Sequence, residues 1–298
     1  MQNPRPLRLL ALLALLPAAL AAQPPSATMR PGLLADYEIK SWYSSKENLD
    51  RGATRNGEAS VTHFGLSLSS RHAVSPTTQL VYGLAYATYE LDAAGAALPD
   101  RLGELSLNLG VIHRLSPTWT LAGYARPGFY SDFESFDADA VNVPVLLLAT
   151  YVVSPELVWS FGLNASAFSD NPVLPIVGLR WQFARDWTFA LGFPQSGFTR
   201  EINDTLALRL GASFAGGNFR VTRNLGVPAP GVPRLANTYL DFTEIRVGLG
   251  ADLALGGDLK LALDVGAVTD RKFDYFDRNY RLDSDTGFFA ALSLRGAF

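Results

Sequence analysis

The sequence contains no cysteine, only two methionines and three histidines, and just 18% charged residues. Without cysteine it can form no disulfide bond, and a lipoprotein anchor, which needs a cysteine at the cleavage site, is excluded. The histidines show no spacing typical of a metal site. We therefore expect no metal and no cofactor, and stability must come from the fold itself.

Long hydrophobic runs are also missing beyond the N-terminal region, so no segment there is predicted to cross a membrane as a helix. The N-terminal region has Arg5 and Arg8, the apolar run Leu9–Leu20, and small residues up to Ala22. This pattern predicts a secretory signal peptide over residues 1–22. A proline-rich periplasmic leader is expected over residues 23–33, and one domain over 34–298.

Charge of one sign is not concentrated anywhere. The net charge is −3 and both signs are interspersed, so no nucleic-acid partner is expected. An exported chain of this kind is periplasmic, secreted, or a barrel in the outer membrane.

Strict two-residue alternation dominates the last sixty residues. In Tyr239–Leu255, Val247 and Leu249 fall on one face, whereas Glu244 and Arg246 fall on the other. Segments 258–269 and 286–298 repeat the pattern, which predicts strands with one apolar face. Lipid outside and water inside a barrel would explain it, but a soluble β-sandwich gives the same alternation.

The connections between strands favour the barrel. Short turns alternate with longer polar segments, as in outer-membrane barrels. The short turns are expected at Ser75-Pro76, Ser116-Pro117, Ser154-Pro155, Arg185-Asp186, Asn203-Asp204 and Gly256-Gly257. The longer loops are expected at 44–60, 92–100, 131–140, 215–237 and 270–285.

The predicted fold class is all-β: a single up-and-down antiparallel transmembrane β-barrel of about 14 strands. Twelve strands follow if Trp187–Ile202 is a hairpin that does not span the membrane. The alternative is a soluble periplasmic β-sandwich that acts as a binding module.

Charged side chains on the inward faces are the candidate functional residues. They are Glu38, Lys40, Arg126, Arg180, Arg209, Glu244, Arg246, Asp252, Lys260, Asp264 and Arg295. We interpret them as a network that lines a polar lumen, with Asp252 or Asp264 paired to Lys260 or Arg295. A constriction that selects solutes by charge is the functional alternative.

The histidines raise the possibility of a barrel-type lipid hydrolase, which needs a histidine beside a serine. His63 shares its face with Ser67 and Ser69, but that face should be the lumen. His72 and His113 lie near predicted turns. Ordinary polar positions are the favoured interpretation, and no catalytic residue is assigned.

Aromatic residues gather near the predicted strand ends, where interface girdles are expected. One girdle would include Trp119, Trp159, Trp181, Phe183 and Trp187, and the other Tyr89, Phe129, Tyr130, Phe168, Tyr239 and Phe242. The terminal Phe298 is similar to the signal that the barrel-assembly machinery reads.

The chain resembles an uncharacterised family of bacterial outer-membrane β-barrel proteins, a domain of unknown function. The resemblance rests on LDFTEIRVGLGADLAL (Leu240–Leu255), DLKLALDVGAVTDRKFDY (Asp258–Tyr275) and RWQFARDWTFALGFPQSGF (Arg180–Phe198). It implies a barrel in the outer membrane and no known activity.

The favoured function is a passive pore or structural barrel without enzymatic activity. Its expected partners are outer-membrane lipid and, during biogenesis, the barrel-assembly machinery and periplasmic chaperones.

Overall fold

The computed structural model describes residues 36–297, so the expected signal peptide, the leader and Phe298 lie outside the described residues. One sheet of seventeen strand segments makes up the fold. The segments are β1 (Asp36–Arg51), β2 (Thr54–Ser75), β3 (Thr78–Ala94), β4 (Arg101–Arg114), β5 (Trp119–Ala125), β6 (Gly128–Ser131), β7 (Val141–Asn142), β8 (Val145–Ser154), β9 (Leu157–Ala165), β10 (Val173–Ala184), β11 (Trp187–Leu191), β12 (Gln195–Asn203), β13 (Leu206–Val221), β14 (Thr238–Gly256), β15 (Leu259–Tyr275), β16 (Tyr280–Ser284) and β17 (Gly287–Ala297). Two short 3-10 helices, η2 (Ala138–Ala140) and η3 (Phe276–Arg278), lie between strands.

The seventeen segments form fourteen barrel strands, because β5 continues into β6, β7 into β8, and β16 into β17. Two of these interruptions contain proline, which has no N–H to donate to the ladder. They are Pro127, between β5 and β6, and Pro144, between β7 and β8. The wall stays joined there because the Arg126 amide donates to the Pro144 carbonyl at 2.9 Å.

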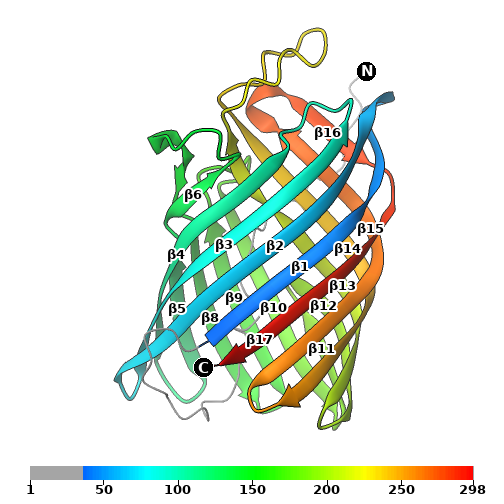
Figure 1. Ribbon diagram of the computed structural model, residues 1–298. Helices are drawn as coiled ribbons and strands as arrows, with labels where there is room; N and C mark the ends of the chain where they lie inside the picture. Colours follow the sequence, from blue (N-terminus) through cyan, green and yellow to red (C-terminus); the bar gives the residue numbers. More distant parts are fainter. Residues whose placement is uncertain (1–35, 298) are drawn as a thin grey trace, which may run out of the picture.

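The ring is closed by its first and last strands. β1 pairs antiparallel with β17 from Asp36↔Ala297 to Ser44↔Phe289. The strands incline around one cylinder, β17 lies beside β1, and the yellow segment between β13 and β14 projects from one end (Figure 1). β11 and β12 are both part of the ring, so the fourteen-strand prediction is confirmed and the twelve-strand alternative is wrong.

The two ends of the barrel differ. Short connections at 76–77, 115–118, 155–156, 185–186, 204–205 and 257–258 lie at the end where residues 36 and 297 meet, which we call the turn end. We call the opposite end, with the connections 95–100, 132–140 and 222–237, the loop end. Every predicted short turn is present.

Two predicted loops are wrong. Segment 44–60 is mostly strand, because β1 and β2 are joined by a two-residue connection at 52–53. Segment 270–285 consists largely of the end of β15 and of β16. In both, buried residues such as Leu49, Arg271 and Phe273 continue the strands inside the barrel, so the strands extend beyond the apolar belt.

The outer wall carries the aliphatic rows that the alternation predicted. Val247, Leu249 and Leu210 are 44%, 60% and 53% exposed, whereas Glu244 and Arg246 on the opposite face are buried. The soluble β-sandwich is therefore wrong, because its aliphatic rows would meet in the middle. Among residues 36–297, no helix is long and apolar enough to cross a membrane.

Only one of the two expected girdles lies on the outer wall. Near the turn end, the outer surface bears Trp119, stacked on Tyr151 at 4.7 Å between ring centroids, and Trp181 beside Phe183. Four of the residues predicted for the second girdle are buried inside the barrel, so that prediction is wrong for them. They are Tyr89, Tyr130, Phe168 and Phe242. Phe242, for example, shares the inward parity of Glu244.

These aromatic side chains belong to an apolar core that fills the loop-end half of the lumen. Its buried members are Trp42, Leu49, Ala59, Val61, Ala87, Tyr89, Leu91, Leu98, Leu102, Tyr130, Phe168, Phe219, Val221, Val232, Leu235, Leu240, Phe242, Phe273, Tyr275, Tyr280 and Leu282. The interior is thus largely apolar towards the loop end, where Arg126 pairs with Glu104, and charges such as Arg209, Asp252 and Asp264 lie further towards the turn end.

Candidate functional site: the lumen and its seal

Two strands from nearly opposite sides of the ring contact each other at the loop end. β6 belongs to the fifth barrel strand and β13 is the eleventh, yet Ser131 and Arg220 form a parallel bridge. The Asp132 amide donates to the Arg220 carbonyl at 3.0 Å. The Asp132 carboxylate accepts the amides of Thr222 at 2.8 Å and Arg223 at 2.9 Å. We call this contact the seal, because it joins opposite walls across the lumen.

The local sequence explains how the seal forms. Pro127 interrupts the strand between β5 and β6, and β6 keeps its pairing with β4 while its last residue, Ser131, reaches β13. On the other side, β12 begins at Gln195, which pairs with Ser213, whereas β13 continues to Val221. The loop-end part of β13 is therefore not covered by β12 and is available to β6.

Hydrogen bonds across the lumen support the seal. The Tyr89 hydroxyl of β3 donates to the Gly216 carbonyl of β13 at 3.2 Å, and the Tyr275 hydroxyl of β15 donates to the Ala97 carbonyl at 2.9 Å. In the connecting loops, Arg223 pairs with Asp100, whose hydrogen bond raises the pKa of the guanidinium. Contacts from several strands thus hold the loop end closed.

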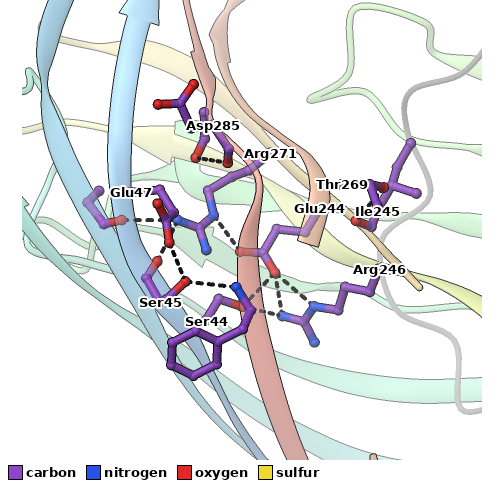
Figure 2. Close-up of polar contacts among 12 residues, drawn as sticks. Ser44, Ser45, Glu47, Glu244, Ile245, Arg246, Thr269, Arg271 and Asp285 are labelled. Atoms are coloured by element: carbon purple, nitrogen blue, oxygen red, sulfur yellow. Dashed lines mark hydrogen bonds and ion pairs between the residues drawn. The ribbon is translucent and has the colours of Figure 1, made fainter. Parts of the chain in front are cut away.

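A buried ionic cluster lies around Glu244, which we call the Glu244 cluster (Figure 2). Arg271 Nε donates to Glu244 Oε1 at 2.7 Å, and Arg246 Nε donates to Glu244 Oε2 at 2.8 Å. The Ser44 hydroxyl also donates to Glu244 Oε2, at 2.9 Å. Arg271 Nη1 reaches the carbonyls of Ser45 at 3.1 Å and Ala59 at 3.0 Å. One carboxylate therefore links β14 and β15 to β1 across the lumen.

Aromatic rings cover the Arg246 guanidinium. Its Cζ lies 3.7 Å from the ring centroid of Trp42 and 5.1 Å from that of Phe289. A cation over an aromatic face is attracted by the ring quadrupole. Arg246 is thereby held at the boundary between the apolar core and the charged part of the lumen.

A second charged group lies on β13, β14 and β15. Arg209 lies 2.9 Å from Asp252 and 3.1 Å from Asp264. Gly250 stands between Arg209 and Asp264 in the register, so no side chain separates them. Because they pair with Arg209, the predicted pairing of these carboxylates with Lys260 or Arg295 is wrong.

The other predicted charges are spread along the interior. Arg295 pairs with Glu38 at 2.8 Å, and Arg126 pairs with the buried Glu104. Lys40 and Arg180 are half-buried, and Lys260 is exposed. The structure thus brings the predicted residues into separate small groups rather than one ring.

Glycines leave space beside Arg209. Gly197, Gly211, Gly248 and Gly266 are cross-strand partners in a row over β12 to β15. A recess of about 100 Å³ lies there and includes Arg209 and Asp264 in its lining. The turn-end half of the lumen is therefore polar and only partly filled.

Arg271 is the functional residue that the sequence reasoning missed, since it was placed in an external loop. It is fully buried and faces inward with Phe273 and Tyr275. The two-residue spacing of Arg271, Phe273 and Tyr275 is the sequence pattern that could have predicted a strand with these side chains on its inward face.

His63 has a structural position. It is buried, its Nδ1 lies 2.9 Å from the Thr88 carbonyl, and its ring lies 5.1 Å from Trp42 and 4.6 Å from Tyr89. The His113 Nδ1 lies 2.9 Å from the Thr78 hydroxyl. Within the part of the chain that the structure describes, no group of His, Cys, Asp and Glu could hold a metal ion.

Two solved structures of channels share this fold. The COG4313 outer membrane channel from Pseudomonas putida F1 is 10% identical, with a TM-score of 0.50, over 93% of this chain and all of that chain. A deletion mutant of the TodX monoaromatic hydrocarbon channel is 13% identical, with a TM-score of 0.51, over 89% of this chain and 91% of that one. None of the curated proteins matches this chain in sequence.

A family model gives the relationship at the level of sequence. It matches residues 20–282, which is most of the chain and includes all barrel strands except β17 and the last two residues of β16. The protein belongs to this family, described as a domain of unknown function (DUF6268).

Proposed function

We propose that the protein is an outer-membrane channel for passive diffusion of small solutes, described here in a closed state. The observation that carries this proposal is the division of the lumen. A polar, glycine-lined half with a recess of about 100 Å³ ends at the apolar core and the seal, which fill the loop-end half. A purely structural barrel of this width has no need for a partly empty, charged interior.

The position of the seal supports a gate. β6 has four residues, and it contacts β13 through one backbone bridge and the Asp132 hydrogen bonds. Because β6 also pairs with β4 and β7 within the ring, release of the seal means loss of its contacts with β13 while β6 keeps its place in the wall. The lumen could therefore open without unfolding the ring.

The proposal includes the outer-membrane location, export by the N-terminal signal peptide, Phe298 as the assembly signal, and no enzymatic activity. The apolar outer wall and the shared channel fold support the location. The enclosure of His63 among aromatic rings argues against a lipid hydrolase, which needs a histidine that reaches substrate.

Planar-bilayer recording of refolded full-length protein tests the channel. We expect brief, rare openings of the wild type. Asp132→Ala should raise the open probability about tenfold, because it removes charge-assisted hydrogen bonds that hold the seal.

Asp137→Ala is the matched control. The Asp137 carboxylate lies in the same loop but accepts its hydrogen bond from the Ser135 hydroxyl, away from the seal, so the openings of this variant should equal those of the wild type. Complete absence of conductance in both the wild type and Asp132→Ala would leave a structural barrel instead.

A further inference from the structure

An apolar patch lies on the outer side of the loop end, where the loop of residues 132–140 follows β6. The Phe136 side chain is 67% exposed. Its ring stacks on Phe133 at 5.6 Å between ring centroids and contacts Phe129 edge-on at 5.8 Å. We call these three rings the phenylalanine patch. In Figure 1 the green segment that follows β6 projects sideways from the loop end. Clustered exposed apolar side chains mark a surface that contacts a partner or a membrane.

The patch continues the apolar outer wall of the barrel. Leu109, Leu107 and Leu105 form an exposed row along β4. Phe129 is the cross-strand partner of Leu105 on one side and of the exposed Val141 on the other. The apolar wall therefore runs without a break from the middle of the barrel to the patch, which makes membrane lipid the partner that it fits.

The patch also lies at the border of a charged rim. The Phe133 ring lies against Gly103 of β4, where an added Cβ would stand 2.5 Å from it. Two residues further along the same strand, the exposed Arg101 pairs with Glu90 at 2.7 Å. Aromatic side chains favour the zone of a membrane in which apolar chains give way to polar headgroups. The phenylalanine patch thus has the position of an interface anchor.

The same loop forms the seal. The Asp132 carboxylate accepts the amides of Thr222 and Arg223 on the far side of the lumen. The next residue, Phe133, has a φ of 55°, which is uncommon outside glycine, and its ring lies on the opposite side, against β4. Two consecutive side chains therefore fasten the loop in opposite directions, one to the seal and one to the outer wall.

We propose that the phenylalanine patch inserts into lipid at the rim of the membrane and that this contact holds the seal closed. Lipid fixes the outer side of the loop, and Asp132 fixes its inner side. Withdrawal of lipid frees the loop and weakens the Asp132 contacts, so the seal responds to the thickness of the bilayer. This inference rests on the proposed membrane channel and adds the regulation of its seal, whose state is measurable without conductance.

The first test asks whether Phe136 contacts lipid. The chain has no cysteine, so Phe136→Cys places a thiol-reactive fluorophore at this position alone. The labelled full-length protein is reconstituted in phosphatidylcholine vesicles whose acyl chains carry bromine, which quenches fluorescence on contact. We expect quenching close to that of a label at Leu249→Cys, on the apolar wall.

Val227→Cys is the matched control. Val227 is also apolar, lies at the loop end and is 62% exposed, but it belongs to the segment 222–237 that projects from the barrel (Figure 1). Its label should be quenched by iodide in the water and not by bromine in the lipid. If the label at Phe136 behaves like the label at Val227, the patch does not contact lipid and the proposal is overturned.

The second test follows the seal by hydrogen exchange. The amides of Thr222 and Arg223 are the reporters, because Asp132 accepts both. In the wild type they should exchange about tenfold faster in dilauroyl than in dioleoyl phosphatidylcholine vesicles, because the thinner bilayer withdraws lipid from the rim. Phe136→Ser should exchange fast in both, whereas Val227→Ser should match the wild type.

Equal exchange of the two wild-type amides in thin and thick bilayers would overturn the link between lipid and seal. A Phe136→Ser variant that keeps the dependence on thickness would overturn it too. A protein that shows the lipid dependence but no conductance would refute the channel and leave this inference standing. Conductance without quenching at Phe136 and without dependence on thickness would do the reverse.

Discussion

At the scale of single residues, Gly250 shows how an absent side chain permits an ion pair. A Cβ placed there would lie 2.3 Å from Asp264 Oδ1 and 3.0 Å from Arg209 Cζ. An approach of 2.3 Å does not occur between unbonded atoms, so the Asp264 side chain would have to move. The Arg209–Asp264 contact therefore depends on glycine at this position.

Gly250→Ala should break the contact between Arg209 and Asp264 and lower the free energy of unfolding by about 1 kcal/mol, the typical value of a partly exposed ion pair. Urea unfolding of the refolded barrel in detergent measures the change. Gly123→Ala is the control, because its Cβ would meet only Leu147 at 3.4 Å, an ordinary contact. Equal effects of the two substitutions would contradict the explanation.

The residue scale also shows what the sequence could and could not predict. Alternation placed Arg209, Asp252 and Asp264 on one face, and in the structure the three side chains are in contact. Their partners could not be predicted, because pairing depends on which cross-strand neighbour lacks a side chain, and that requires the register. The register is set by strand ends, which the sequence left uncertain.

At the scale of elements, the Glu244 cluster fastens three strands together. Glu244 lies on β14, Arg271 on β15, and Ser44 on β1. All three side chains are buried. A carboxylate between two guanidinium groups reduces their mutual repulsion, and its removal leaves buried positive charge uncompensated.

Glu244→Gln should therefore lower the free energy of unfolding by about 3 kcal/mol or more. Glu38→Gln, at the more exposed pair with Arg295, should cost less than about 1 kcal/mol. Thermal unfolding followed by circular dichroism in detergent compares them. If both variants lose the same stability, the buried cluster has no special role.

Strand ends were the least predictable feature of the elements. The segment from Asp270 to Asp285 is rich in aspartate and arginine, which indicated a solvated loop. In the structure, Arg271, Phe273 and Tyr275 continue the inward face of β15. Where a strand extends beyond the apolar belt, its outward side chains meet water, as the side chains of a loop do. Its polar residues therefore resemble those of a loop.

The same parity explains the misplaced girdle. Tyr89 and Phe242 were assigned to the outer surface because they lie near strand ends. Their positions in the alternation match the inward residues Ala87 and Glu244. The position of a residue in the two-residue alternation therefore predicts whether its side chain faces inward or outward better than its distance from the strand end does.

At the scale of the whole molecule, the closed ring and its apolar outer wall follow from the sequence pattern, whereas the seal does not. The contact between Ser131 and Arg220 joins positions far apart in the chain that are not neighbours in the ring. No local pattern encodes such a contact.

The outer wall predicts the behaviour of the whole protein. It should be recovered with the outer-membrane fraction, require detergent for extraction, and migrate differently on gels before and after boiling, because the hydrogen-bonded ring resists unfolding. Fractionation of expressing cells and paired gel lanes check this. Recovery in the buffer-soluble fraction would contradict the membrane assignment.

The four residues of β6 stand in a frame that has no free edge. Because β6 pairs with β4 and β7 within that frame, the frame cannot dilate without breaking its ladders, so permeability of the proposed channel has to be governed by contacts inside the ring. Loss of the Asp132 contacts at the end of β6 has the amplitude of a loop motion, whose timescale is about nanoseconds to microseconds. The entrance would then flicker rapidly while the cylinder around it keeps its diameter.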